Sequence, residues 1–265
     1  SITITPDPAN VGIGATQLFT AVGKDASGNV VAVAPTWSVV AGGGVVWTDE
    51  LPVADAQRAA ATGIPATAVT LSVADIALDA AGNLYIADAG NWCIWRVDVA
   101  TGLIINVAGR IGGRRDGDGG PAVEAELASP AGVAVDVDGN ILITEWYAYR
   151  VRRVDAATGL ISTVAGTGIE GDEGDGGPAA DAAFSQLWDV TVDRAGNLYL
   201  ADAGNRRIRR VDAETGHIET VAGNGRRGFS GDGGPAVDAS LSEWPASVAV
   251  DALGNLAIAD GASDR

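Results

Sequence analysis

The side chains of this sequence best suited to contacting a ligand are aromatic, and they cluster after a recurring turn. Trp92 and Trp95 follow one such turn, and the same positions one period later hold Tyr149 and Arg152. Aromatic rings give a large contact area at low entropic cost, so they could stack on a sugar ring or hold a peptide. The alternative is that they pack neighbouring sheets together. Trp146 and Tyr147 stand where other copies of a sequence repeat have Ala and Gly. The candidate ligand-binding residues are Trp92, Trp95, Trp146, Tyr147 and Tyr149.

Acidic, glycine-rich loops offer a second kind of chemistry. The segments RRDGDGGPA and EGDEGDGGPA place carboxylates one or two residues apart, GFSGDGGPA adds a single aspartate among glycines, and calcium prefers six to eight oxygen ligands. An aspartate before glycine is equally explained by its side chain holding the turn, and no complete EF-hand spacing is present. Both interpretations stay open: no cofactor is required, and calcium is the cation the loops would take. The candidate metal ligands are Asp116, Asp118, Asp172, Asp175 and Asp232.

Catalysis has little support. His217 is the only histidine, so a centre that holds its metal through several histidines cannot form, and no G-x-S-x-G motif occurs. Paired carboxylates for glycoside hydrolysis are neither indicated nor excluded in so acidic a chain. The basic run RRIRRVD lies among acidic residues, and we expect it to form salt bridges with Asp202, Asp212 and Glu214.

Charge and hydropathy exclude several classes of partner. The 265 residues contain 34 acidic and 17 basic side chains, a net charge of −17 that repels nucleic acid and anionic lipid. No segment approaches the roughly 20 apolar residues needed to span a bilayer. SITITPDPAN lacks the pattern of a signal peptide. Cys93 is the single cysteine, and we expect it to be a small core residue.

The elements that position these residues form a sequence repeat. Gly-Asn recurs at 82, 139, 196 and 254, with spacings of 57, 57 and 58, and GDGGPA begins at 117, 174 and 231. Residues 190–223 divide into four short β-rich runs separated by AGN, AGN and AETG, which predicts a four-stranded antiparallel meander with almost no helix. Such sheets must pack face to face, and radial packing predicts a β-propeller.

The repeats also resemble a known family. DAAGNLYIADAGN (79–91), DRAGNLYLADAGNRRIRRVD (193–212) and GFSGDGGPA (228–236) are similar to NHL repeats of the long bacterial type. The resemblance implies an NHL propeller domain over 59–265, with three full blades and a fourth cut short. Family members close with about six blades, so closure would need further sequence, another chain or the N-terminal region.

The N-terminal region differs. ITITP, VGIGATQLFTA and PTW resemble a bacterial immunoglobulin-like domain of group 2, which implies an incomplete sandwich over 1–58. The alternating runs agree with a small sandwich. The alternative is a degenerate blade, since DASGNVVAVA echoes DAAGNLYIADA.

Together these patterns predict an all-β chain in which an immunoglobulin-like sandwich precedes a partial propeller. By analogy with the family we expect a non-catalytic, secreted or cell-surface module that binds protein or glycan through its loops, without nucleic acid or membrane insertion. Two alternatives are a structural subunit that self-associates through an open blade edge, and a calcium-dependent propeller lyase or lactonase.

Overall fold

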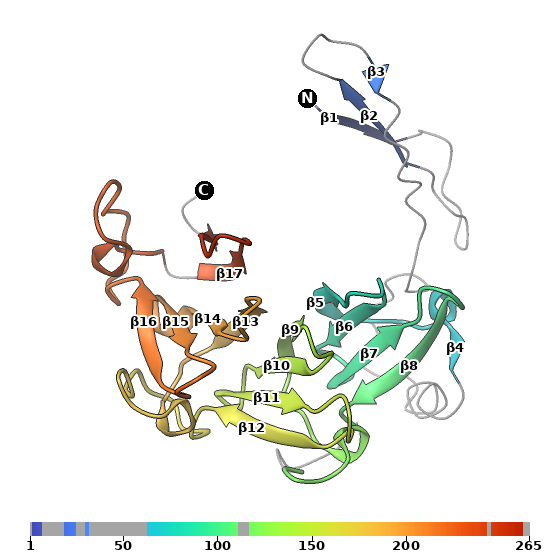
Figure 1. The fold of residues 1–265 in the computed structure, drawn as a ribbon, viewed down its shortest axis with the longest axis horizontal. Helices are drawn as coiled ribbons and strands as arrows, with labels where there is room; N and C mark the ends of the chain where they lie inside the picture. Colours follow the sequence, from blue (N-terminus) through green and yellow to red (C-terminus); the bar gives the residue numbers. More distant parts are fainter. Residues whose placement is uncertain are drawn as a thin grey trace.

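The structure is a computed structural model that describes residues 2–6, 19–24, 30–31, 63–110, 117–242 and 245–261. Its ordered elements are β-strands and short 3-10 turns, with no α-helix among the described residues. Successive antiparallel sheets are arranged side by side in an open arc (Figure 1). The predicted all-β, propeller-like architecture is confirmed.

Each full repeat folds into one blade with its strands in sequence order. Blade 1 comprises β5 (Val73–Leu78), β6 (Leu84–Asp88), β7 (Cys93–Val97) and β8 (Leu103–Ala108), with β4 (Ile64–Pro65) added beside β8. Blade 2 comprises β9 (Pro130–Val135), β10 (Ile141–Glu145), β11 (Arg150–Val154) and β12 (Ile161–Ala165). Blade 3 comprises β13 (Leu187–Val192), β14 (Leu198–Asp202), β15 (Arg207–Val211) and β16 (Ile218–Ala222). The described part of the fourth blade is the pair β17 (Pro245–Val250) and β18 (Leu256–Asp260).

The first hairpin of every blade is set by an Asp-x-x-Gly-Asn turn. In blade 1, Asp79 accepts the backbone N–H groups of Ala81 and Asn83, and Gly82 takes the positive φ of 85° that the turn requires. The Asn83 side chain then accepts the N–H of Val99, which ties this turn to the one between β7 and β8. Although burial opposes it, these hydrogen bonds hold the pKa of Asp79 below its usual value.

The second turn is built differently from the first. Its left-handed residue is neither the glycine nor the asparagine of AGN but the residue that follows. Trp92, Tyr149 and Arg206 have φ of 56°, 49° and 55°. The glycine is needed for close approach instead, since a Cβ on Gly90 would lie 2.7 Å from the Cβ of Ser72.

The GDGGPA loops join each outer strand to the next inner strand. The loop before blade 2 exchanges hydrogen bonds with Ile161 of the blade's outer strand, from Gly119 and to Gly120. It then forms a 3-10 turn, η2 (Ala122–Glu124), after Pro121. The same turn recurs as η1 (Ala66–Ala68), η3 (Ala179–Asp181) and η5 (Ala236–Asp238).

Apolar residues between the blades form the cores. Inner strands β5, β9, β13 and β17 contact one another in succession. Between blades 2 and 3, for example, Leu142 and Val151 pack with Phe184 and Leu200. Cys93 lies in the blade 1 core, as expected, and burial raises the pKa of its thiol well above the usual value.

Near the N-terminus, β1 (Ile2–Pro6), β2 (Phe19–Lys24) and β3 (Val30–Val31) form a three-stranded antiparallel sheet. The remainder of the predicted immunoglobulin-like domain over 1–58 lies outside the described residues, so that assignment stays a prediction. The part of the chain that is described has no helix long and apolar enough to cross a membrane.

Candidate functional site

One face of the propeller carries the left-handed residues, and we call it the turn face. It is the face at which the inner strands begin and the second strands end, because Pro130 pairs with Glu145 and Leu187 pairs with Asp202. The turns between second and third strands therefore lie on it. A left-handed conformation costs free energy for a residue other than glycine, and such strain is concentrated at functional positions.

The five aromatic candidates are distributed differently from expectation. Trp95 is completely buried, and its indole N–H donates to Asp88 at 2.9 Å, so its assignment to a ligand-binding surface is wrong. Tyr149 is half-buried and packs against the core between blades 2 and 3. Trp92 and Tyr147 are exposed, with 41% and 56% of their surface accessible.

Three aromatic rings converge on the turn face between blades 2 and 3. The ring of Tyr147 stacks on that of Trp146 with centroids 5.8 Å apart and an interplanar angle of 15°. Trp146 also contacts Trp188 of the neighbouring blade, with ring centroids 4.5 Å apart. We call Trp146, Tyr147 and Trp188 the aromatic cluster. Sequence reasoning found the first two but missed Trp188, although it replaces the alanine of other copies, Ala74, Ala131 and Ala246.

Blade 2 differs from its neighbours at several other positions around the cluster. Blades 1 and 3 have a serine, Ser72 or Ser185, against the turn glycine, whereas blade 2 has Ala128 beside Tyr147. Blade 2 therefore lacks the serine hydroxyl group at the place where Tyr147 replaces the turn glycine. All three backbone N–H groups still bond to the carboxylate that ends the second strand, as in Ala128 to Glu145 at 2.6 Å.

The inner strand of blade 2 changes with them. Gly132 stands where blades 1 and 3 have an aspartate, and its N–H donates to the Thr144 hydroxyl at 2.7 Å. The Thr144 hydroxyl in turn donates to the backbone carbonyl of Trp188 at 3.1 Å. Thr144, an alanine in blades 1 and 3, therefore fixes the backbone that carries Trp188.

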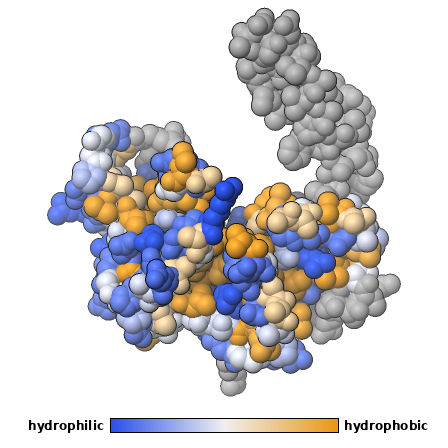
Figure 2. Space-filling view, in the orientation of Figure 1, coloured by the Kyte–Doolittle hydropathy of each residue, from blue (hydrophilic) through white to orange (hydrophobic). Residues whose placement is uncertain are grey.

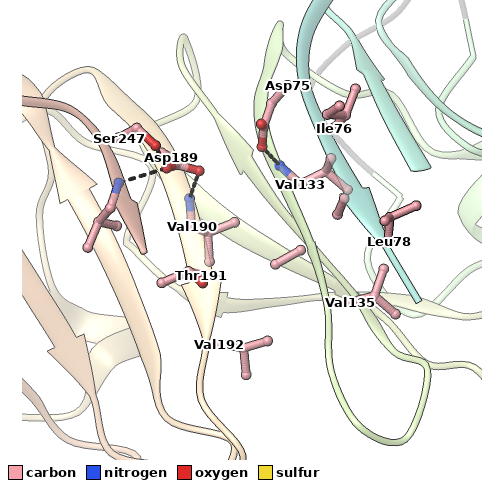
Figure 3. A pocket seen from close by; sticks show the side chains of 13 residues that line it. Asp75, Ile76, Leu78, Val133, Val135, Asp189, Val190, Thr191, Val192 and Ser247 are labelled. Atoms are coloured by element: carbon pink, nitrogen blue, oxygen red, sulfur yellow. Dashed lines mark hydrogen bonds between the residues drawn. The ribbon is translucent and has the colours of Figure 1, made fainter. Parts of the chain in front are cut away.

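A cavity of about 290 Å³ lies between the four inner strands. Two aspartates line it and link successive blades: Asp75 accepts the Val133 N–H at 2.8 Å, and Asp189 accepts the Val248 N–H at 2.9 Å and the Ser247 hydroxyl at 2.6 Å (Figure 3). Desolvation raises the pKa of Asp75 to about 6, with a contribution from the nearby charge of Asp189. Desolvation also raises the pKa of Asp189. Neither aspartate belongs to a motif that the sequence singles out.

The acidic loops hold buried arginines. Arg209 has no exposed side-chain surface, and it joins Asp175 of the loop at 2.8 Å to Asp202 at 3.4 Å. Arg152 joins Asp118 and Glu145 in the same way. The loop carboxylates thus neutralise buried arginines that would otherwise each have a single carboxylate partner.

These ion pairs bear on the predicted metal ligands. Asp172 pairs with Arg207 at 3.1 Å, and Asp232 lies in the equivalent loop of the fourth blade. Asp116 lies outside the described residues. Within the described ranges, no three His, Cys, Asp or Glu side chains are grouped so as to hold a metal ion. Calcium binding by these loops stays a prediction from their spacing.

The run RRIRRVD forms the salt bridges expected of it, with one change. Arg209 pairs with Asp202, and Arg210 pairs with Asp212 at 2.8 Å. The cross-strand partner of Arg210 is Glu219 at 3.0 Å, not Glu214. His217 is exposed and forms an isolated antiparallel β-bridge with Pro178.

Comparison with known proteins supports the repeat type. No family model matches the chain. SUPPRESSOR OF QUENCHING 1, chloroplastic, from Arabidopsis thaliana is 30% identical over 185 residues, which are 67% of this chain and 17% of that protein. NHL repeat-containing protein 2 from Bos taurus is 31% identical over 152 residues, 54% of this chain and 20% of that protein. The chain therefore spans a fifth or less of these curated relatives.

A solved structure confirms the fold. A protein of unknown function from Bacteroides thetaiotaomicron superposes with a TM-score of 0.57 at 22% identity, covering 71% of this chain and 44% of that one. These similarities support an NHL-type β-propeller. The blade framework is common to the repeats of this chain, so the features specific to this propeller are the positions at which its repeats differ from one another.

Proposed function

We propose that the chain is a non-catalytic interaction module of a secreted or cell-surface protein, and that the turn face of the NHL-type propeller is its binding surface. The observation that carries this proposal is the coordinated change in blade 2. Where blades 1 and 3 have alanine and glycine after the second strand, blade 2 has Trp146 and Tyr147, and Trp188 replaces alanine opposite them. A repeat framework requires none of these rings.

The surrounding turns support the same surface. The position after each second turn varies between Trp92, Tyr149 and Arg206 while the strands beside it stay similar. Tyr and Trp supply rigid, amphipathic contact area, and Arg adds directed hydrogen bonds, so these are the residue types that dominate binding surfaces.

The proposal is tested by restoring the repeat. The variant Trp146→Ala/Tyr147→Gly/Trp188→Ala has the residues of the other blades, and circular dichroism and thermal unfolding would establish that it folds. Arrays of immobilised oligosaccharides and of peptides would be probed with both proteins. We expect the wild-type chain to retain at least one probe that the variant loses. Equal retention by both folded proteins, or no retention on either array, would overturn the proposal.

A second candidate function, self-association, is favoured by the face of blade 1 that points away from blade 2. Apolar residues gather over β5 and β6 (Figure 2), and Ile76 is 57% exposed whereas its equivalents Val133, Val190 and Val248 are at most 3% exposed. A blade of another copy would bury this strand face. Sedimentation of the wild-type chain and of Ile76→Asn tests this. We expect the wild-type chain to form a dimer that the substitution dissociates. A wild-type monomer at 100 μM, roughly a hundred times a micromolar Kd, would refute it.

A further inference from the structure

Building on the proposed function, we infer that the aromatic cluster binds an uncharged glycan, with a pyranose ring stacked on Tyr147 and its hydroxyl groups held by Gln186 and Ser129. Tyr147 offers the stacking surface, because it is 56% exposed and its ring lies within 15° of parallel to the ring of Trp146 beneath it. The C–H face of a pyranose is flat and apolar, so it fits such a ring with little entropic cost.

Two polar residues lie beside the cluster along the backbone. Trp146 donates its backbone N–H to the carbonyl of Ser129 at 3.2 Å, and Gln186 precedes Trp188 by two residues. Ser129 and Gln186 occupy the same place in blades 2 and 3, immediately before the inner strand, and both are half-buried. The hydroxyl and the carboxamide can each donate and accept, which is what a sugar hydroxyl needs from a partner.

The backbone at these two positions supports a role beyond the fold. Ser129 and Gln186 have positive φ of 55° and 51°, a conformation that neither residue type favours. The corresponding connection of blade 1 lacks this residue, since Val73 follows Ser72 directly. The strained residue is therefore not required to build a blade, and it occurs on both sides of the one interface that carries the aromatic cluster.

Charge decides between classes of ligand. The chain has a net charge of −17, so acidic glycans and acidic peptides are repelled. A peptide that binds by adding a strand would need a sheet edge, but Trp146 and Tyr147, two of the three rings, lie in the turn between the second and third strands of blade 2. An uncharged glycan needs neither an edge nor a countercharge.

Thr144 contributes as a positioning residue. Its hydroxyl holds the carbonyl of Trp188 at 3.1 Å while accepting the Gly132 N–H at 2.7 Å. It touches no ligand itself. Thr144→Ser keeps both hydrogen bonds and should bind as wild type, whereas Thr144→Val should weaken binding by releasing the strand that carries Trp188.

Isothermal titration with uncharged hexasaccharides of glucose, mannose and N-acetylglucosamine tests the inference, beside polygalacturonate and a set of peptides. We expect at least one uncharged hexasaccharide to bind, Tyr147→Gly to weaken it about tenfold or more, and Gln186→Ala to weaken it several-fold. Phe229→Ala, which alters an aromatic residue that is 58% exposed on an inter-blade loop, serves as the control and should bind as wild type.

The outcomes separate the ligand class from the binding surface. Binding of only polygalacturonate or only a peptide, sensitive to Tyr147→Gly, would refute the uncharged glycan as ligand and leave the proposed turn-face function standing. Hexasaccharide binding that neither Tyr147→Gly nor Gln186→Ala weakens would refute the site. No binding by any probe would refute both.

Discussion

Replacing Asp75 by asparagine should stabilise the propeller at neutral pH, although it removes a carboxylate that links two blades. Asp75 is half-buried in the central cavity, and its pKa is raised from 3.8 to about 6 by desolvation first of all. Because the folded-state pKa lies above the unfolded one, Asp75 favours folding most below pH 4. This contribution is lost as pH rises through about 6.

The magnitude follows from that shift. A displacement of about 2 pKa units corresponds to about 3 kcal/mol at 1.36 kcal/mol per unit. Partial exposure of the side chain screens the charge, so we reduce this to about 1–2 kcal/mol. The carboxamide of the substituted side chain keeps a carbonyl oxygen that can accept the Val133 N–H, which Asp75 accepts at 2.8 Å, so little hydrogen bonding is lost.

Urea unfolding at pH 7.5 and pH 4.5 measures the effect. We expect Asp75→Asn to raise the free energy of unfolding at pH 7.5 and to match the wild type more closely at pH 4.5. Asp79→Asn is the control with opposite sign, since hydrogen bonds lower the pKa of Asp79 and its loss should destabilise at pH 7.5. A variant Asp75→Asn that is less stable than wild type at pH 7.5 would refute the reasoning.

Three further stability predictions follow from the blade contacts. Arg209→Met should cost about 3–5 kcal/mol because Asp202 is left buried without its cation, and adding Asp202→Asn should recover part of it; no recovery in thermal unfolding would contradict this. Gly132→Ala should cost about 1–3 kcal/mol, since the new Cβ would lie 2.8 Å from the next blade's backbone; an unchanged melting temperature would argue against the packing. Val133→Ser should cost about 2–4 kcal/mol and Ile76→Ser less than about 0.5 kcal/mol in dilute solution; equal losses in urea unfolding would mean that the face of blade 1 is covered.

The blade itself could be predicted from the sequence because its determinants are local and repeated. The Asp-x-x-Gly-Asn turn requires positive φ at glycine, and Gly82 and its three equivalents supply it. The second turn could not be predicted in this way, because Gly90 is required by its close approach to a distant serine. That close approach depends on the chain entering from the loop before the blade, which no local pattern reveals.

The site was harder to predict because exposure depends on packing between blades. Trp92 and Trp95 follow the same turn three residues apart, yet one is exposed and the other buried. A comparison of the copies contained a usable signal. Arg152 and Arg209 each pair with an aspartate of the loop that precedes their blade. The loop before blade 1 has no aspartate at this position, and the residue equivalent to these arginines is Trp95, which donates to Asp88 instead. Trp188 could have been found in the same way, as a tryptophan among alanines.

The central claim is that ligand binds at the aromatic cluster of the turn face, and fluorine NMR tests it most directly. The chain labelled with 5-fluorotryptophan has seven reporter positions, assigned by single substitutions to Phe. On addition of the uncharged hexasaccharides and peptides that the chain retains, the resonances of Trp146 and Trp188 should shift while that of the buried Trp95 stays in place. Shifts confined to tryptophans outside the cluster, with Trp146 and Trp188 unmoved, would contradict the account.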